Sequence, residues 1–376
     1  MENKVLLREI VPYALLEEML EGGYVRMQVH PLYPGRLGVL NYSEQAQFGR
    51  VWNAATNACR GLVVELAGGA LSAGSGVVAR GFNKFHNLNT EYAPETMEAS
   101  LPDEVPLVTA KLDGSLGILY AWDGLPWMAT RGSFDSAQAR WATARLREHD
   151  NWWRLSRPSA TPVFEIIYPE NRIVVDYDFA DIVLLALVDK ATGLDLPRAA
   201  AEDYARFGGF RLVERFDKSL AECAREDNPN EEGYVLTYST GVKVKVKFAE
   251  YCRLHRILTG MNPKAVWEML AAGQDSALSA LLGDERMPAA FRAWLGGWTA
   301  RLRRELASAE AEARGVFDRR PEGTRKDHAL YFKAAAPHLA PVLFAMLDGR
   351  DHRPMILDRI RPKATDAFVP EDGPGG

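Results

Sequence analysis

A lysine in the middle of the chain is followed at once by an acid and a glycine, in the run Ala110-Lys111-Leu112-Asp113-Gly114-Ser115. The lysine ends an apolar segment, so we expect it on a strand that leads into a tight turn. A lysine held beside other cations can lose its proton near neutral pH and act as a nucleophile. The structural alternative is an edge-strand lysine entering an Asp-Gly turn, and three fixed residues alone do not decide between the two.

Three lysines alternate with valines in residues 242–248, the run VKVKVKF. On a strand, Lys243, Lys245 and Lys247 project from one face, about 7 Å apart. Three like charges on one face repel one another, and a bound phosphate would relieve that repulsion. The alternative is the solvated face of a half-buried strand.

Two acidic segments lie at or near apolar strands. Glu165 stands inside the apolar run 164–168, and Glu231-Glu232 comes directly before the run 233–235. A carboxylate inside an apolar strand is costly unless it is paired or hydrogen-bonded. A structural ion pair would satisfy Glu165, as would a hydroxyl or a metal-bound water. Acids at the start of a strand are common, so Glu232 is uninformative by itself.

Three further cations stand beside glycines or aromatic residues. Arg60 precedes Gly61, Lys84 lies in the run Phe82-Asn83-Lys84-Phe85, and Arg131 precedes a glycine. Each is a weak signal alone, but the order of all these motifs is specific. R-G-x-x-x-E, F-x-K-F, K-x-D-G-S, F-E-x-x-Y-P, E-G-Y-V and K-x-K-x-x-x-Y occur once each, in this order, across residues 60–251.

This series resembles the covalent nucleotidyltransferase superfamily of ATP-dependent ligases and mRNA capping enzymes, and within it the phage RNA ligase 1 (tRNA-repair) family. The resemblance implies that Lys111 attacks the α-phosphorus of ATP and forms a lysyl–AMP intermediate, with Asp113 and Gly114 shaping its loop. Arg60 would contact the nucleotide and Lys84 the triphosphate.

The remaining positions are assigned in the same way. Glu165 would lie near the ribose and Glu232 near the metal, and we take both as candidate metal ligands. Lys245 and Lys247, with Tyr251, would grip the phosphates. Two further cations fit the pattern less closely. Arg131 stands where the family often has a lysine before glycine, and Lys243 lies one step outside K-x-K-x-x-x-Y.

The implied activity is ATP-dependent RNA ligation with Mg²⁺, for which Mn²⁺ could substitute. AMP moves from Lys111 to an RNA 5′-phosphate, and a 3′-hydroxyl then attacks to form the phosphodiester. We expect tRNA-like substrates, and we expect the clustered cations to lower the pKa of Lys111. The alternatives are a DNA ligase, a GTP-using capping enzyme and a noncatalytic RNA-binding protein. The first two usually carry a β-barrel after the K-x-K strand, whereas this sequence turns helical after Tyr251.

The elements that position these residues predict an α+β fold with antiparallel sheets. We expect a nucleotidyltransferase domain over 1–260, an all-helical domain over 261–368 that could recognise RNA, and a disordered tail over 369–376. The predicted strands are 61–66, 106–114, 115–122, 161–168, 171–177, 181–189, 232–238 and 242–248. The predicted helices are 11–21, 134–149, 198–207, 263–272, 275–282, 288–318, 325–335 and 338–348, the first of the C-terminal ones starting at Asn262-Pro263.

Composition bounds the function. A net charge of −5 over 376 residues excludes a uniformly basic nucleic-acid binder, so a polyanion must meet a local positive site. Three scattered cysteines predict no disulfide framework, and with no signal-peptide pattern we expect a cytoplasmic protein. No apolar run reaches the ~18–20 residues of a membrane helix, and we expect a monomer without a membrane partner. The arginines of 301–304 and 319–325 could line an RNA surface, although interleaved acids favour a solvated face.

Overall fold

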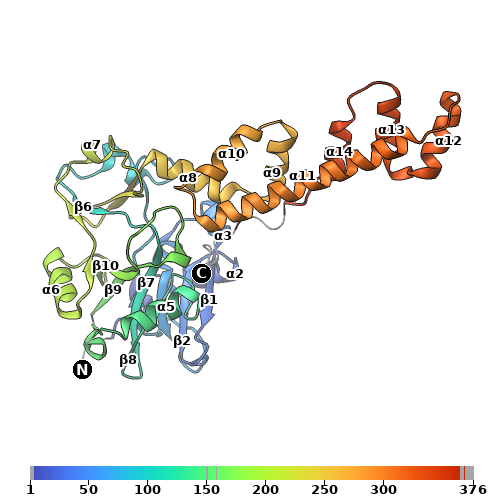
Figure 1. The fold of residues 1–376 in the computed structure, drawn as a ribbon. Helices are drawn as coiled ribbons and strands as arrows, with labels where there is room; N and C mark the ends of the chain where they lie inside the picture. The colour runs from blue at the N-terminus through green and yellow to red at the C-terminus, as the bar shows by residue number, and fades with distance from the viewer. Residues whose placement is uncertain (1–3, 150, 158, 365–367, 369–376) are drawn as a thin grey trace. The chain divides into compact units, whose positions relative to one another are not determined.

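The computed structural model describes residues 4–149, 151–157, 159–364 and 368. The chain divides into two compact units, and the division falls between Arg253 and Leu254, inside helix α8 (Ala249–Gly260). The tail predicted to be disordered, 369–376, lies outside the described residues. The first unit is rich in strands and the second is helical, so the predicted α+β class is confirmed (Figure 1).

The first sheet of the N-terminal unit is antiparallel throughout. Its strands are, in order, β1 (Val25–Val29), β2 (Leu37–Tyr42), β3 (Arg60–Glu65) and β4 (Val77–Arg80). Helices α2 (Tyr13–Glu21) and α4 (Ala54–Ala58) share a core with the sheet, in which Leu16, Leu40 and Leu62 are fully buried. The side chain of Asn53 accepts hydrogen bonds from the backbone of Ala55 and Thr56, which fixes the start of α4.

The second sheet has the order β11-β10-β9-β7-β8. Its strands are β7 (Ser115–Trp122), β8 (Leu125–Ala129), β9 (Ala160–Ile167), β10 (Asp181–Asp189) and β11 (Arg211–Leu212). Helices α5 (Ala137–Leu146) and α6 (Arg198–Gly208) pack on it, burying Phe164, Ile182 and Tyr204. Only the β10–β11 pair of this sheet is parallel.

The third sheet, ordered β12-β6-β13-β14-β5, carries Lys245 and Lys247, and two of its strands end or begin next to Lys111 and Glu232. It consists of β12 (Arg215–Phe216), β6 (Leu107–Ala110), β13 (Gly233–Thr237), β14 (Lys243–Lys247) and β5 (His86–Asn87). In the β13–β14 register Gly233 faces Lys247, and the backbone N–H of Lys111 donates to the carbonyl of Gly233 at 2.8 Å. Pairing therefore brings Lys111, Glu232 and Lys247 to one end of the sheet.

Shorter elements connect these sheets. They are α1 (Leu7–Ile10), α3 (Glu44–Gly49), α7 (Leu220–Cys223) and the 3₁₀ turns η1 (Pro94–Thr96), η2 (Glu98–Ser100), η3 (Trp152–Arg154) and η4 (Pro169–Asn171). The predicted strand over 171–177 is wrong. Its backbone does not join a ladder, because the N–H groups of Val174 and Val175 donate to the Asp113 carboxylate at 2.8 and 2.9 Å.

The second unit is built from helices alone in its described residues. After α8 come α9 (Pro263–Ala271), α10 (Asp275–Gly283), α11 (Ala289–Asp318), α12 (Arg325–Ala335), η5 (Pro337–Leu339), α13 (Ala340–Leu347) and α14 (Arg353–Arg359). The side chain of Asn262 caps α9 at Ala265, as Asn-Pro predicted. A core around Leu306, Phe332 and Leu343 joins α11, α12 and α13.

Some of the basic residues of the second unit have carboxylate partners. Arg301 pairs with Glu305 at 2.8 Å and Arg303 with Asp275 at 2.5 Å, and Arg325 is bonded to Asp348. These contacts favour the solvated alternative for Arg301, Arg303 and Arg325. No single helix among the described residues is long and apolar enough to cross a membrane. The one combination that qualifies by length and composition is α12 with the segment 337–347, which is bent by 120°.

The packing of α12 gives a stability prediction. Phe332 is fully buried, whereas Leu330 on the same helix is 62% exposed. Phe332→Ala should cost roughly 3–5 kcal/mol of unfolding free energy because it leaves a cavity, and Leu330→Ala should cost less than about 0.5 kcal/mol. Urea denaturation followed by helical circular dichroism measures both. Equal losses would show that α12 does not pack as described.

Candidate active site

Lys111 directly follows β6 and faces a buried carboxylate. Its Nζ lies 2.7 Å from Oε2 of Glu232, whose Oε1 lies 2.7 Å from Nζ of Lys247. Glu232 is only 3% exposed, so one buried carboxylate bridges two lysines. The bridge fixes the Lys111 side chain at the end of a rigid ladder. A nucleophile held in a fixed position can be aligned with the bond that breaks in a bound substrate, which in-line attack requires.

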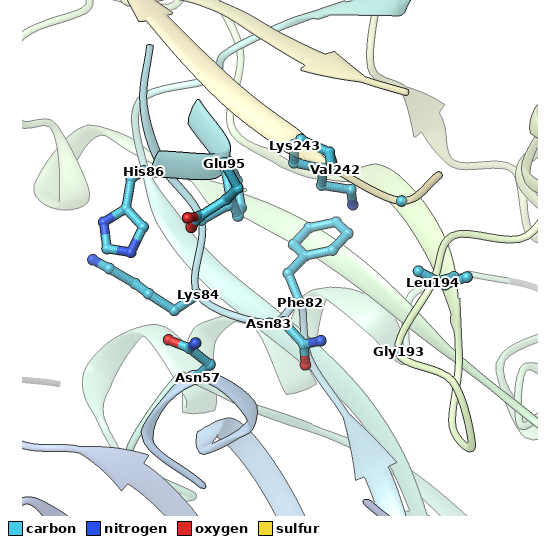
Figure 2. Close-up of a pocket in the computed structure, with 12 residues that line it drawn as sticks. Asn57, Phe82, Asn83, Lys84, His86, Glu95, Gly193, Leu194, Val242 and Lys243 are labelled. Carbon is cyan, nitrogen blue, oxygen red and sulfur yellow. The ribbon is translucent and has the colours of Figure 1, made fainter. Parts of the chain in front are cut away.

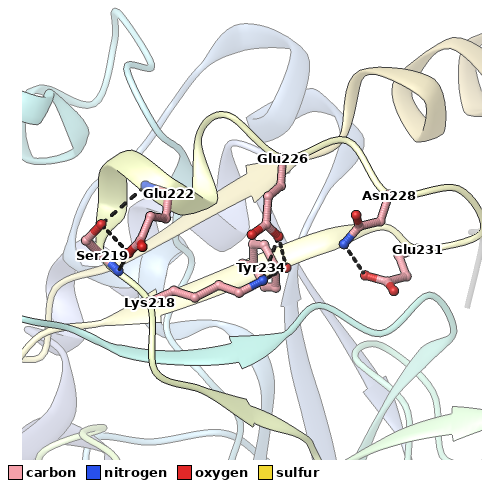
Figure 3. A network of polar contacts seen from close by, with 7 residues as sticks. All are labelled: Lys218, Ser219, Glu222, Glu226, Asn228, Glu231 and Tyr234. Carbon is pink, nitrogen blue, oxygen red and sulfur yellow. Dashed lines mark hydrogen bonds and ion pairs between the residues drawn. The ribbon is translucent and has the colours of Figure 1, made fainter.

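A network of polar contacts fixes the segment that leads into Glu232 (Figure 3). Lys218 donates to the Tyr234 hydroxyl at 2.7 Å and pairs with Glu226 at 2.6 Å, and the Tyr234 hydroxyl also donates to Glu226. Glu231 accepts from Asn228 at 3.3 Å instead of facing Lys111. Of the two adjacent acids, only Glu232 therefore serves the site.

Asp113 organises the loop rather than meeting solvent. One oxygen accepts the N–H groups of Val174 and Val175, and the other accepts the Tyr251 hydroxyl at 2.8 Å. The N–H of Asp113 itself donates to the Tyr177 hydroxyl at 2.8 Å. Tyr251, assigned by resemblance to the phosphates, is buried and bonds Asp113 here, so its contacts are those of a positioning residue.

Gly114 is required by a close approach of β9. A Cβ atom at this position would lie 2.5 Å from the carbonyl oxygen of Ile166 and 3.2 Å from Cγ of Glu165. Any side chain would therefore push the Lys111 loop away from the strand that carries Glu165. The glycine of the K-x-D-G motif thus serves the pairing of β7 with β9 as well as the turn.

Lys245, like Arg60, Lys84 and Arg131, is a cation of the site without an ion pair among the described residues. No carboxylate among the described residues lies within ion-pair distance of it, and its ammonium stands over the Phe85 ring at 4.5 Å. Burial, followed by the charges of Lys111 and Arg60, lowers the pKa of Lys245 well below its ordinary value. A group in this position gains from any anion that enters.

Arg60 and Lys84 extend this positive region. Burial lowers the pKa of each, and Nη1 of Arg60 is buried without a hydrogen-bond partner in the described structure. Gly61 has φ +78°, and a Cβ there would lie 1.9 Å from the Ile118 side chain, so the glycine allows β3 to carry Arg60 into the site. We call Lys245, Arg60, Lys84 and Arg131 the cation cluster.

Tyr42, at the end of β2, belongs to the site and was missed by sequence reasoning. Arg131 donates to its hydroxyl at 3.1 Å, and the Lys84 ammonium lies 5.1 Å from its ring centre. Burial alone would raise the pKa of Tyr42, but Arg131 and Arg60 outweigh it and the pKa is lowered. No motif in residues 37–42 distinguishes this tyrosine from a core residue.

Lys243 shares its strand face with Lys245 but not its environment. Its Nζ lies 2.6 Å from Oδ1 of Asp195 and 3.8 Å from the Phe82 ring centre. Arg80 holds the same 189–195 turn by donating to the carbonyls of Lys190 and Ala191. Lys243 therefore anchors a turn, and its charge is already neutralised.

The predicted pKa of Lys111 was wrong in direction for this state. Burial works to lower it, but the carboxylates of Glu232 and Glu165 outweigh burial, and the pKa of Lys111 is raised. The neighbouring cations act instead on Lys245. The sequence-based prediction counted the effect of the neighbouring cations on Lys111. It did not count the opposite effect of the Glu232 carboxylate, which bridges Lys111 and Lys247.

The two candidate metal ligands, Glu165 and Glu232, differ in whether their carboxylate oxygens already have partners. Both oxygens of Glu232 are taken by lysines. Glu165 has no hydrogen bond or ion pair among the described residues, and burial raises its pKa to about 8. A partly buried carboxylate without an ion pair among the described residues fits a divalent cation that also binds phosphates, since Mg²⁺ uses one or two carboxylates with substrate oxygens. The described residues hold no cluster of three or more metal-binding side chains.

Comparison with known proteins decides the family. A sequence profile described as RNA ligase, of the phage T4 RNA ligase 1 type, matches residues 58–251. This range spans about half of the chain and every motif of the site. The chain belongs to this RNA ligase family. Lys111, Glu232 and the cation cluster all lie within the matched range.

Two relatives resemble this member of the family over longer stretches. A putative RNA ligase of Thermovibrio ammonificans is 29% identical over 210 residues, 53% of this chain and 54% of that protein. An RNA ligase of Rhodothermus phage RM378 is 23% identical over 304 residues, 62% of this chain and 67% of that protein. The chain thus spans about half the length of the first relative and about two thirds of the second.

Two solved structures of RNA ligases are also similar to this chain, at low sequence identity. An archaeal ATP-dependent RNA ligase is 17% identical with a TM-score of 0.46, covering 90% of this chain and 80% of that one. An RNA ligase of Naegleria gruberi, a lysine-to-alanine mutant with ATP and Mn, is 18% identical with a TM-score of 0.33. It covers 40% of this chain and 51% of that one.

The ligase-family motifs converge in space. Strands β3, β6, β9, β13 and β14 carry or adjoin six of the motif residues: Arg60, Lys111, Glu165, Glu232, Lys245 and Lys247. Lys84, Asp113, Gly114 and Arg131 lie in connecting segments, and Tyr251 lies in α8. Three further residues contact the motif residues but lie outside the motifs: Tyr42, Tyr177 and Asp195. Each lies in a different strand or loop, far from its partner in sequence.

The contrast between Lys243 and Lys245 gives a second prediction. Lys243→Met should lower the free energy of unfolding by roughly 3 kcal/mol, because it leaves the largely buried Asp195 carboxylate unpaired. Lys245→Met should raise it, because an unpaired cation is removed from among others. Urea denaturation measures both, and Lys243→Met combined with Asp195→Asn should recover most of the loss. The same sign for both single variants would contradict the assigned pairing.

Proposed function

We propose that this protein is an ATP-dependent RNA ligase that joins RNA 5′-phosphate and 3′-hydroxyl ends through a lysyl–AMP on Lys111. The observation that carries the proposal is the unpaired cation Lys245 within a cluster beside a fixed lysine. A polyphosphate supplies the negative charge that this cluster lacks. Family membership and the helical unit after Tyr251 support RNA ligase over DNA ligase or capping enzyme.

In the first step, Nζ of Lys111 forms a bond to the α-phosphorus of ATP while the bond from that phosphorus to pyrophosphate breaks. The lysine must first give up its proton, since an ammonium has no free electron pair. Lys245, Arg60 and Lys84 are placed to neutralise the phosphate oxygens, which is the main contribution a protein makes to such a transfer.

In the second step, an oxygen of the RNA 5′-phosphate forms a bond to the same phosphorus and the bond to Lys111 breaks. The product is a 5′–5′ pyrophosphate between AMP and RNA, and the lysine takes back a proton. In the third step, a 3′-hydroxyl oxygen attacks the RNA phosphorus and AMP leaves. Glu232 holds Lys111 in place between turnovers through the 2.7 Å contact.

A divalent cation fits this site through Glu165, and Glu232 can join it only if a lysine contact opens. When bound, Mg²⁺ or Mn²⁺ would neutralise charge on the phosphate oxygens. We further propose a role in RNA repair with tRNA-like substrates, following the family resemblance. The three cysteines are free, which supports a reducing, cytoplasmic location.

Self-adenylylation tests the proposal directly. Incubation with Mg²⁺ and ATP labelled on its α-phosphate should give an acid-labile label on the protein, and Lys111→Ala should abolish it because the nucleophile is gone. Lys111→Arg is the matched variant, as it keeps the charge without a reactive amine. GTP in parallel tests the capping alternative. A label that survives Lys111→Ala would overturn the proposal, and labelling by GTP alone would favour a capping enzyme.

Removal of divalent ions should stop the reaction without unfolding the protein. Chelation should lower the rate of labelling by at least about 100-fold, given the several kcal/mol of charge stabilisation that such an ion supplies. Added Mn²⁺ should restore the rate. The melting temperature should stay nearly unchanged, since no described cluster binds a structural metal. Full labelling in excess chelator would exclude a metal role.

A further inference from the structure

A line of aromatic and cationic side chains leads away from the cation cluster. The Lys84 ammonium lies 4.8 Å from the Trp52 ring centre, and Trp52 meets His86 edge to face at 5.3 Å. His86 in turn meets Tyr92 at 5.4 Å, and the Arg50 guanidinium lies 4.7 Å over the Tyr92 ring. We call these five residues the aromatic track.

The outer end of the aromatic track is open to solvent. Tyr92 is 45% exposed, and Phe48, two residues before the exposed Arg50, is 80% exposed. Arg50 has φ 54°, a left-handed conformation that is uncommon for residues other than glycine and that caps α3. Exposed rings beside cations are the surface on which single-stranded nucleic acids stack their bases.

The inner end of the track opens on a cavity of about 220 Å³ (Figure 2). Asn57, Lys84 and His86 line it, and Figure 2 shows the Lys84 and His86 side chains side by side. Oδ1 of Asn57 and Nε1 of Trp52 are buried without a hydrogen-bond partner in the described structure.

The geometry of the reaction says which strand should lie here. Pyrophosphate leaves the α-phosphorus on the side opposite Lys111, because the transfer is in line. The RNA 5′-phosphate must later enter opposite the departing Lys111, and so from the place that pyrophosphate left. The resemblance assigns that place to Lys84, from which the aromatic track begins.

We propose that the aromatic track binds the 5′-phosphorylated strand of the RNA as a single strand, with its terminal phosphate toward Lys84. The nucleotides that follow stack outward on Tyr92 and Arg50. The inference rests on the proposed function and adds the location and form of one substrate strand.

The charges around the track favour stacking over phosphate contacts. Glu95 lines the cavity beside His86, and Glu91 precedes Tyr92 in the chain. Glu91 would oppose a phosphate held at the outer end, whereas Glu95 lies at the inner cavity, where Lys84 supplies a positive charge. The bases therefore supply most of the contact at the outer end.

The test uses the full chain and separates the two chemical steps. The adenylylated enzyme is mixed with a 5′-phosphorylated single strand of about ten nucleotides whose 3′ end is blocked, and transfer of AMP to RNA is followed. Tyr92→Ala and Arg50→Asn should each raise the KM for this strand about tenfold, as expected for one lost stacking contact. Asparagine tolerates the left-handed backbone of Arg50.

Phe207→Ala is the matched control. Phe207 is 39% exposed on α6 with the Arg157 guanidinium 5.7 Å from its ring, so it offers the same chemistry outside the track. It should leave the KM unchanged. An equal effect of Phe207→Ala and Tyr92→Ala would overturn the proposal, as would a rise confined to the KM of a 3′-hydroxyl acceptor strand.

A binding measurement keeps the two proposals distinguishable. If wild-type protein fails to label itself with ATP, the proposed function fails. Fluorescence anisotropy of the 5′-phosphorylated strand then decides on the track. Weaker binding by Tyr92→Ala than by Phe207→Ala supports it, and equal binding by both overturns it.

Discussion

The carboxylate of Glu232 is the contact on which the site depends. It is almost fully buried and holds two lysines from different strands at 2.7 Å each. Without it, Lys111 and Lys247 would repel each other at the end of a sheet. With it, both lysines are held in place by one carboxylate, whereas Lys245 has no carboxylate partner among the described residues. The hydrogen bonds of Tyr234 and of Asp113 serve to hold the strands that this carboxylate joins.

This arrangement explains how a protein with a negative net charge can still have a site for a polyanion. A net charge of −5 excludes a surface that is basic throughout. The cation cluster instead concentrates its charge in partly buried positions, where few counter-charges are present and salt screens weakly. In the helical unit, Arg301, Arg303 and Arg325 have carboxylate partners, so that unit does not add a free basic face through them.

Sequence reasoning found the motif residues because their order along the chain is specific. It could not distinguish Lys243 from Lys245, because the partner that separates them, Asp195, lies 48 residues away in a turn. The strand predicted over 171–177 failed for a related reason, since Asp113 takes the N–H groups that a ladder would need. Tyr42 gave no signal at all. In each case the deciding contact joins segments whose approach is set by tertiary structure.

The Lys243–Asp195 pair also gives the row of lysines a definite length. Three ammonium groups stand at equal spacing on one strand face. Lys245 has no carboxylate partner among the described residues, and Lys247 shares Glu232 with Lys111. Asp195 closes the outer end, so an anion that followed the row would find no attraction beyond Lys245. The anion-binding part of this strand is therefore short. Its length suits a short chain of phosphates rather than a long nucleic-acid backbone.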